Sequence, residues 1–460
     1  MASGCRNSVR IRETCQISPF HRQSDTQFSL PLTFFDVFWL KFPPVERIYF
    51  YEITDLTPHL FYSAILPRLK HSLSLALCHF LPLAGHIKWP PHSSKPLLLY
   101  TPHCSWVSLV VAESDADFHH LSSHQVRDAL DSHPYVPMLS VSDTDASIIA
   151  IQITFFPNKG FSIAYSIHHA VLDGTSITMF LRAWSFICKH FDGDENSPQF
   201  QLPSELVPSF DRAFFEDPSG LEALFINQWE ALTGSASNLK LMSSLCTMPN
   251  IVRSTFQLSR EDINKLKERM TSQVSNQIHL SSFVVTYAYV LVCMVKARGG
   301  DDNRKVHFLF VVDYRSRLDP PVPGNYFGNC VFPCEAVSRA RDFMEDNGVA
   351  VIGEKISGVI KGLEKRLFEG AETMIPSMKI SEQGIQFISV AGSPRFEVYE
   401  FDFGWGRPKK VEIISIDRTG AVSLNQSRDE KGGVEIGLAL PRHEMDTFAS
   451  LFVDGLKDFQ

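Results

Sequence analysis

The chain has 460 residues, enough for about two or three domains. Hydrophobic residues make up 44% of the chain and charged residues 20%, which is typical of a globular protein and excludes an intrinsically disordered one. The formal net charge of -8 argues against a nucleic-acid-binding protein, for which a basic domain is expected. A local basic pocket for an anionic ligand remains compatible with this charge.

The first half of the chain predicts a mixture of helices and strands. Residues 59–80 have the apolar spacing of a helix, and the chain-breaking segment Pro82-Leu-Ala-Gly85 follows them. Alternation predicts a strand from Phe161 to Ile167, and apolar residues at helical spacing then continue to His190. Further strands are predicted at residues 48–53, 96–100, 106–112 and 146–156.

Residues 191–220 differ in composition from the segment before them. They contain four prolines, several acidic residues and no helical period. A structureless segment of this length usually separates domains or carries function. We therefore predict an N-terminal domain at 1–190, a crossover loop at 191–220 and a C-terminal domain at 221–460.

The second half again predicts both kinds of element. Ser259, and Ser281 or Ser282, are of the residue type that caps a helix amino terminus. Helices are predicted at residues 259–270, 281–296, 337–368 and 443–459. Strands are predicted at residues 306–312, 386–390, 396–401, 411–416, 421–424 and 434–440. The chain is therefore expected to have an α/β fold.

Several features bear on location and partners. The amino-terminal segment lacks the continuous apolar run of a secretory signal, and the longest apolar run, residues 283–295, is too short to span a bilayer. We therefore expect no export and no membrane partner. The nine cysteines are scattered without a CxxC pair, which favours a reduced, cytoplasmic protein without a metal site. A monomer is the default expectation.

The junction after Ile167 carries the candidate chemistry, in the sequence His168-His169-Ala-Val-Leu-Asp173-Gly174. A histidine there can accept a proton at neutral pH, because its ordinary pKa is about 6.5. Asp173 could orient His169, or could turn away and hold the loop.

Three kinds of chemistry compete for His169, beside a purely structural role. Metal ligation needs two or three further ligands at fixed spacing, and none stands beside the motif. A serine hydrolase needs a GxSxG nucleophile elbow, which the sequence lacks. Direct general-base catalysis needs only the histidine, a positioned acceptor and a donor for the oxyanion.

A second unusual segment is Asp402-Phe403-Gly404-Trp405-Gly406. Two glycines that flank a tryptophan indicate special backbone angles around a large aromatic anchor, which is typical of a structural turn. A basic cluster lies nearby, and it could be a solvated surface or could attract phosphates. It consists of Arg395, Arg407, Lys409 and Lys410.

Taken together, HHAVLDG at 168–174 and DFGWG at 402–406 resemble the plant BAHD acyltransferases, which are acyl-CoA-dependent. Similar segments are PLAG at 82–85, VDYRSRLDPP at 312–321 and YFGNC at 326–330. VAGSPRF at 390–396 resembles the subgroup that acts on anthocyanin, flavonoid and phenolic glucosides. The resemblance extends from about residue 30 to the carboxyl end.

This resemblance implies a two-domain α/β fold of the chloramphenicol acetyltransferase type. A solvent channel lies between the domains, the long crossover loop joins them, and a segment around 382–403 pairs with the N-terminal domain. CoA enters one end of the channel and the acceptor the other. The family implies no permanently bound cofactor, because acyl-CoA is a co-substrate.

The resemblance also implies roles for the motif residues. His169 would take the proton from a sugar hydroxyl of a glycosylated phenolic acceptor. Asp173 would point away from the reaction and pair with an arginine, for which Arg315 is our candidate. Gly174 would give the following helix room, and the DFGWG turn would hold the CoA side without touching the reacting atoms.

The sequence says least about which residues contact the acyl-CoA donor. Ser393 and Arg395 are candidate contacts for the CoA phosphates. Relatives commonly carry Lys or Arg directly after the motif glycine to hold a malonyl group, whereas this chain has Thr175, so Arg182 is a candidate replacement. An apolar slot that includes Phe38 would instead suit a hydroxycinnamoyl group such as coumaroyl or caffeoyl.

Subgroup resemblance favours malonyl-CoA over hydroxycinnamoyl-CoA as the donor. A catalytically inactive CoA-binding relative is a further alternative, which the presence of His169 disfavours.

Overall fold

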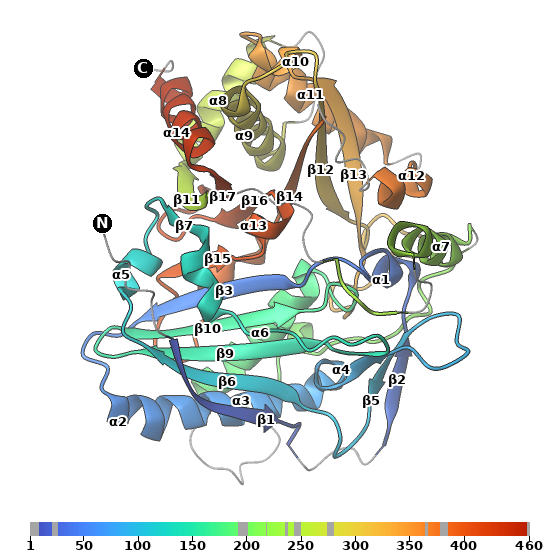
Figure 1. Ribbon diagram of the computed structural model, residues 1–460, viewed down its shortest axis with the longest axis vertical. Helices are drawn as coiled ribbons and strands as arrows, with labels where there is room; N and C mark the ends of the chain where they lie inside the picture. Colours follow the sequence, from blue (N-terminus) through green and yellow to red (C-terminus); the bar gives the residue numbers. More distant parts are fainter. Residues whose placement is uncertain are drawn as a thin grey trace.

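The strands of the computed structural model form three sheets (Figure 1). The structure describes residues 9–20, 26–191, 201–217, 219–234, 238–242, 250–273, 280–363, 367–377 and 385–457. Predictions that concern the other residues, among them residues 1–8 of the amino-terminal segment and residues 192–200 of the crossover loop, lie outside the described residues.

A six-stranded sheet carries the strand that leads to His169. That strand, β10 (Gly160–Ile167), is buried along its whole length between two neighbours, because it lies inside the sheet and both of its faces are covered. The strands, in spatial order, are β1 (Val9–Ile17), β6 (Val107–Ser114), β9 (Ile149–Phe156), β10, β3 (Val45–Glu52) and β15 (Lys410–Ile413).

A seven-stranded sheet forms the second half of the molecule. Its strands, in spatial order, are β13 (Val331–Arg339), β12 (Lys305–Asp313), β14 (Ile385–Ala391), β16 (Ala421–Gln426), β17 (Val434–Pro441), β11 (Ile251–Leu258) and β7 (Arg127–Asp128). A smaller sheet in the first half has the order β2 (Phe28–Pro31), β5 (Leu97–Tyr100), β4 (His86–Lys88) and β8 (Asp145–Ser147).

The two halves exchange strands. β15 comes from the second half and pairs with β3 of the first, whereas β7 comes from the first half and pairs with β11 of the second. A segment around 382–403 was predicted to pair with the N-terminal domain. This prediction is wrong, because the strand of that segment, β14, pairs with β12 and β16 inside the second sheet. The strand that crosses follows that segment in the chain.

The strand β15 that crosses between the halves overlaps the strand predicted at 411–416, but the burial of its charges was not predicted. Lys410 and Glu412 alternate with Val411 and Ile413, a pattern typical of a half-exposed strand, yet all four residues are buried. Glu412 pairs with Arg127 at the junction of the halves. Burial alone would raise the pKa of Glu412, but the nearby cations lower it to about 2. The charges are therefore matched across the junction.

Helices cover the outer faces of both large sheets. Figure 1 shows α3 beneath the six-stranded sheet and α9 among the helices of the second half. The helices of more than one short turn are α3 (Leu66–His79), α6 (Gly174–His190), α7 (Leu221–Thr233), α8 (Arg260–Gln273), α9 (Ser282–Arg298), α11 (Gly348–Gly362), α12 (Ala371–Ser377) and α14 (Arg442–Lys457). Short helices are α1 (Phe34–Phe38), α2 (Pro58–Leu60), α4 (Leu81–Ala84), α5 (Phe118–Leu121), α10 (Arg341–Met344) and α13 (Ile416–Thr419). A π turn (Phe61–Ile65) joins α2 to α3, and 3-10 turns lie at Ala129–Tyr135, Ser204–Leu206, Pro394–Phe396 and Val398–Glu400.

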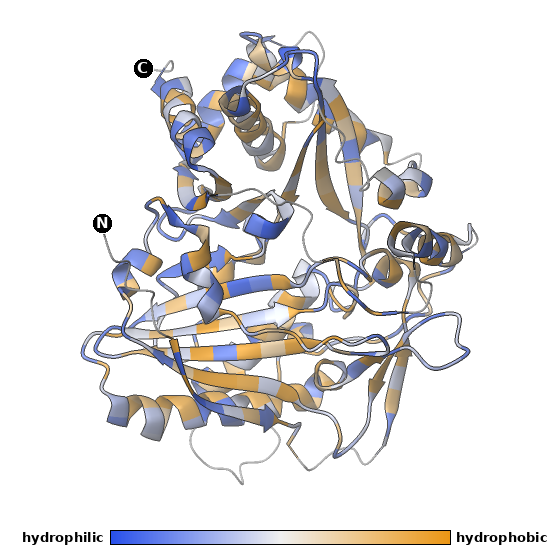
Figure 2. Ribbon diagram, viewed as in Figure 1, coloured by the Kyte–Doolittle hydropathy of each residue, from blue (hydrophilic) through white to orange (hydrophobic). Residues whose placement is uncertain are grey.

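Burial follows the apolar pattern of the sequence. α9 is buried nearly all round, and Ser281 caps it by accepting a hydrogen bond from the Val284 amide, as the sequence predicts. Figure 2 shows hydrophobic residues along β6 and β9. One extensive apolar core runs through both halves, which therefore share packing as well as strands.

Two predicted elements are wrong. The strand predicted at 396–401 is a pair of 3-10 turns, because Glu397 has a positive φ of 49° that interrupts an extended backbone. The helix predicted from 337 begins only at Arg341, because residues up to Arg339 belong to β13, which the sequence analysis missed.

Candidate active site

The motif at 168–174 links β10 to α6 and lies where the two halves meet. Asp173 caps α6 by accepting a hydrogen bond from the Ser176 amide at 3.0 Å. Asn329 of the second half donates from its side-chain amide to the His169 carbonyl at 3.0 Å. The backbone around His169 is therefore fixed from both halves of the chain.

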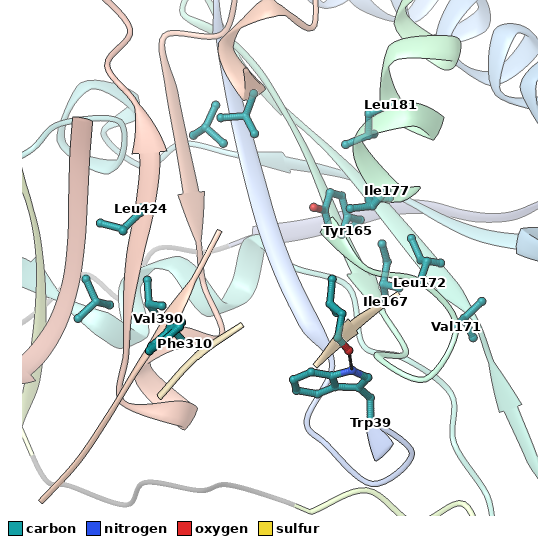
Figure 3. Packing of buried hydrophobic residues seen from close by; sticks show 14 of the residues in the cluster. Trp39, Tyr165, Ile167, Val171, Leu172, Ile177, Leu181, Phe310, Val390 and Leu424 are labelled. Atoms are coloured by element: carbon teal, nitrogen blue, oxygen red, sulfur yellow. Dashed lines mark hydrogen bonds between the residues drawn. The ribbon is translucent and has the colours of Figure 1, made fainter. Parts of the chain in front are cut away.

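The ring of His169 lines a cavity and stacks on the indole of Trp39. The two ring centroids are 4.1 Å apart and the planes are nearly parallel, with an angle of 8°. Trp39 is itself held by a hydrogen bond from its Nε1 to the Val331 carbonyl at 3.4 Å (Figure 3). Nδ1 of His169 is buried and, among the described residues, has no hydrogen-bond partner. Nε2 is then the nitrogen that is free to face a substrate.

His169 is uncharged at neutral pH. Burial lowers its pKa to about 4, although the charge of Asp173 acts in the opposite direction. Burial lowers the pKa of the neighbouring His168 further, to about 3. A neutral imidazole has a lone pair on one nitrogen, so His169 can accept a proton from a hydroxyl group.

This low pKa predicts an unusual acid limit for activity. We expect kcat/KM to stay nearly constant from pH 8 down to about 5, because the base form of His169 persists until the pH approaches its pKa of about 4. The measurement is the pH dependence of kcat/KM for the acyl-CoA donor at a saturating concentration of the acceptor. An acid limb with its midpoint at 6.5 or above would contradict the buried, neutral state of the ring.

Asp173 pairs with Arg315, as the resemblance implies. Two nitrogens of the guanidinium donate to the two carboxylate oxygens, at 2.8 and 3.1 Å, and the Cys330 amide donates to the same carboxylate at 3.0 Å. Burial alone would lower the pKa of Arg315, but Asp173 and Asp313 raise it by favouring the charged form. No hydrogen bond joins the Asp173 side chain to His169 in the described structure. Of the two roles considered from the sequence, the geometry therefore favours the one in which Asp173 holds the loop over the one in which it orients His169.

Gly174 leaves room for a side chain from the other half. A Cβ atom on Gly174 would lie 2.3 Å from the ring of Phe396, closer than such atoms can approach. Gly174 thus makes space for Phe396, which belongs to the VAGSPRF segment, and the expectation that it also gives room to its own helix stays a prediction. This contact places that segment against the start of α6.

Two site residues were missed by sequence reasoning. Trp39 supports the His169 ring, although the sequence analysis singled out Phe38 next to it. Asn329 joins the His169 carbonyl to Asp36, whose carboxylate accepts from the Asn329 side-chain amide at 3.0 Å. Asn329 lies in the YFGNC segment that carries the family resemblance and Trp39 directly follows Phe38, but the partners of both residues are more than a hundred residues away.

The DFGWG turn lies at the far end of α6 and does not line the cavity within the described residues. Asp402 closes the turn by accepting from the Gly404 and Gly406 amides at 2.8 and 2.9 Å, and it also accepts from Lys189 at 2.8 Å. Both glycines have positive φ, of 107° and 91°. Phe403 packs on Trp184, and Arg68 lies over Trp405. The turn is thus a brace between α3, α6 and the second half.

The cavity between the halves has a volume of about 2300 Å³ and is lined from both sides. Figure 3 shows Tyr165 and Ile177 of the first half and Phe310, Val390 and Leu424 of the second. The predicted donor-contact residues line it as well, although their roles stay predictions. They are Phe38, Thr175, Arg182, Ser393 and Arg395.

The charge of Arg182 is already paired. Its guanidinium donates to Glu397 at 2.8 Å, and its side chain is 39% exposed. Arg182 is therefore a poor replacement for a cation at position 175. Thr178 and Thr286 also line the cavity, and the hydroxyl of each is buried without a hydrogen-bond partner among the described residues.

The described residues contain neither a cluster of metal ligands nor a membrane-spanning helix. No group of three or more His, Cys, Asp or Glu side chains there could hold a metal ion. No described helix is long and apolar enough to cross a membrane.

Comparison with known proteins identifies the family. A model described as the Transferase family matches residues 7–454. Phenolic glucoside malonyltransferase 2 of Arabidopsis thaliana is 44% identical over 98% of this chain and 99% of its own length. The chain belongs to the BAHD acyltransferases. It is an acyl-CoA-dependent acyltransferase, with acyl-CoA as its co-substrate.

Two further similarities bear on the fold and on the donor. The crystal structure of vinorine synthase has a TM-score of 0.70 and 21% identity, and the match covers 96% of this chain and 98% of that one. The predicted two-domain α/β fold is thereby confirmed. Agmatine coumaroyltransferase of Arabidopsis thaliana is 38% identical over 97% of this chain and 98% of its own length.

Proposed function

We propose that this acyltransferase moves a malonyl group from malonyl-CoA to a sugar hydroxyl of a phenolic or flavonoid glucoside, including anthocyanins. The observation that carries the chemistry is a neutral histidine at a cavity that both halves line. The identity to a phenolic glucoside malonyltransferase, at 44%, supports the donor and the acceptor class.

The geometry supports a direct transfer with His169 as general base. Nε2 of His169 takes the proton of the sugar hydroxyl while its oxygen attacks the thioester carbonyl carbon. The tetrahedral intermediate then collapses, the carbon–sulfur bond breaks, and CoA leaves as a thiol with the proton returned by His169. Both substrates are held against one base, so the bimolecular reaction becomes effectively intramolecular. Much of the acceleration comes from this positioning.

A second candidate differs only in the donor. The 38% identity to an agmatine coumaroyltransferase and the aromatic residues around His169 support a hydroxycinnamoyl-CoA donor for the same acceptors. Arg182 is paired and Thr175 is uncharged, so neither of the two positions considered from the sequence supplies a free cation for malonyl.

The test is thiol release from malonyl-CoA and from p-coumaroyl-CoA, each with a panel of flavonoid and simple phenolic glucosides. We expect acceptor-dependent release with malonyl-CoA and a product heavier than the acceptor by one malonyl group. Release without acceptor would indicate a thioesterase, and release with neither donor would indicate a binding-only relative. Faster transfer from p-coumaroyl-CoA would favour the second candidate.

We include a cytoplasmic location and a monomeric state in this proposal. The scattered cysteines of the sequence support a reducing compartment. Sedimentation of the purified protein tests the second point.

A further inference from the structure

Eight arginine and lysine side chains of the described residues line the cavity, and Arg47 differs from the others in its burial. Only 4% of Arg47 is exposed, whereas each of the other seven is partly or fully exposed. A buried charge acts more strongly on a ligand, because little water screens it. The other seven are Arg182, Arg317, Lys361, Arg395, Arg407, Arg428 and Lys431.

Arg47 also lacks an anionic partner in the part of the chain that the structure describes. Its Nε is buried without a hydrogen-bond acceptor, and no ion pair joins it to a carboxylate of the described residues. Beside burial, the groups that act most on its charge are the tyrosines 49, 165 and 399. The two other fully buried arginines at the junction, Arg127 and Arg253, both face Glu412. An unpaired buried cation lowers stability, so its presence points to an anion that arrives with a ligand.

The neighbouring tyrosines do not supply that anion. Burial raises the pKa of Tyr49 well above its ordinary value, and burial likewise raises the pKa of Tyr165 despite the charge of Arg47. Both phenols are therefore neutral. Tyr165 lines the cavity together with Arg47, and its hydroxyl is of a type that donates to a carboxylate.

The strand register places Arg47 between His169 and the predicted CoA contacts. Arg47 lies opposite Tyr165 of β10, two residues or about 7 Å along the strand from Ile167, and His169 follows Ile167 by two residues. On its other side, the guanidinium lies 3.5 Å from the place that a Cβ atom on Gly392 would take. Gly392 directly precedes Ser393, a candidate contact for CoA.

The chemistry of the donor fits this position. In a malonyl thioester a single methylene separates the carboxylate from the reacting carbonyl carbon. Its receptor must therefore lie inside the cavity, near the general base. We propose that Arg47 binds the free carboxylate of the malonyl group, and this assignment rests on the proposed malonyl-CoA donor.

The test compares two donors that differ only in that carboxylate. Wild type, Arg47→Met and Arg47→Lys are assayed with malonyl-CoA and acetyl-CoA and one common acceptor. We expect Arg47→Met to lose about 100-fold in kcat/KM with malonyl-CoA, as expected for a charge-assisted bidentate contact, and to change less than about 3-fold with acetyl-CoA. Arg47→Lys should retain part of the malonyl preference, because it keeps the charge. Arg182→Met should affect both donors equally.

Thermal melting provides the second measurement. Malonyl-CoA should raise the Tm of the wild type more than acetyl-CoA does, and this difference should vanish in Arg47→Met. The Tm of unliganded Arg47→Met should equal or exceed that of the wild type, because an unpaired buried charge is removed.

Three outcomes would overturn the assignment. Equal losses with both donors, or a lower Tm of the unliganded variant, would mean a structural role for Arg47. A malonyl preference that survives in Arg47→Met but is lost in Arg182→Met would assign the carboxylate to Arg182. A wild type that transfers coumaroyl but not malonyl would instead refute the proposed donor itself.

Discussion

Replacement of His169 by alanine should reduce kcat by about 10²- to 10⁴-fold, the usual contribution of a general base. The ring is the only described group that combines a neutral, proton-accepting nitrogen with a place in the cavity between the halves and support from the stacked Trp39. The measurement is acceptor-dependent thiol release with the preferred donor. Donor binding, measured by calorimetry without acceptor, should change little, because the reacting proton is absent from that complex.

A matched control uses a histidine far from the cavity. His119 has a side chain that is 52% exposed, and it pairs with Glu52 at the surface, so His119→Ala should keep wild-type activity. If His169→Ala also kept the wild-type rate, the motif would be a structural turn and the base would have to be sought elsewhere in the cavity.

The sequence predicted many of the elements and the motif, because these depend on local pattern, although the strand predicted at 396–401 is wrong and β13 was missed. The strand from Phe161 to Ile167 and the serine cap of α9 are properties of neighbouring residues, and both are found as predicted. The pairing of Asp173 with Arg315 spans 142 residues, and only the resemblance to the family made it predictable.

Contacts between the two halves that the family resemblance does not imply were missed, and the reason is physical. The stack of Trp39 on His169 and the room that Gly174 leaves for Phe396 depend on how the two halves pack, and no local period records this. β15 lies close to a predicted strand, but its pairing with β3 and the burial of its lysine and glutamate against charges on other segments were not predicted. Buried charges are thus the points at which a pattern of hydrophobicity is least informative here.

The second large effect should come from breaking the ion pair between Asp173 and Arg315. Asp173→Asn removes the buried partner of the guanidinium and leaves only the half-exposed Asp313 near it, and loss of a buried charge partner typically costs roughly 3–5 kcal/mol. The pair is buried, with side-chain exposures of 7% for Arg315 and 1% for Asp173. Because the loop also carries His169, displacement by about 1 Å should reduce kcat by up to about 100-fold. Thermal melting and thiol release measure the two effects.

The double variant Asp173→Asn with Arg315→Met separates a geometric role from a chemical one. It removes both charges, so it should regain much of the stability that the single variant loses, since the cost lies in the unpaired charge. As a surface control, Glu261→Gln breaks the exposed pair with Lys265 on α8 and should cost less than about 1 kcal/mol. A double variant as unstable as Asp173→Asn would show that the hydrogen bonds of this carboxylate to the Ser176 and Cys330 amides matter more than its charge pair. Loss of activity in Asp173→Asn without loss of stability would mean that Asp173 acts on the reacting atoms, contrary to the geometry in which its carboxylate faces Arg315.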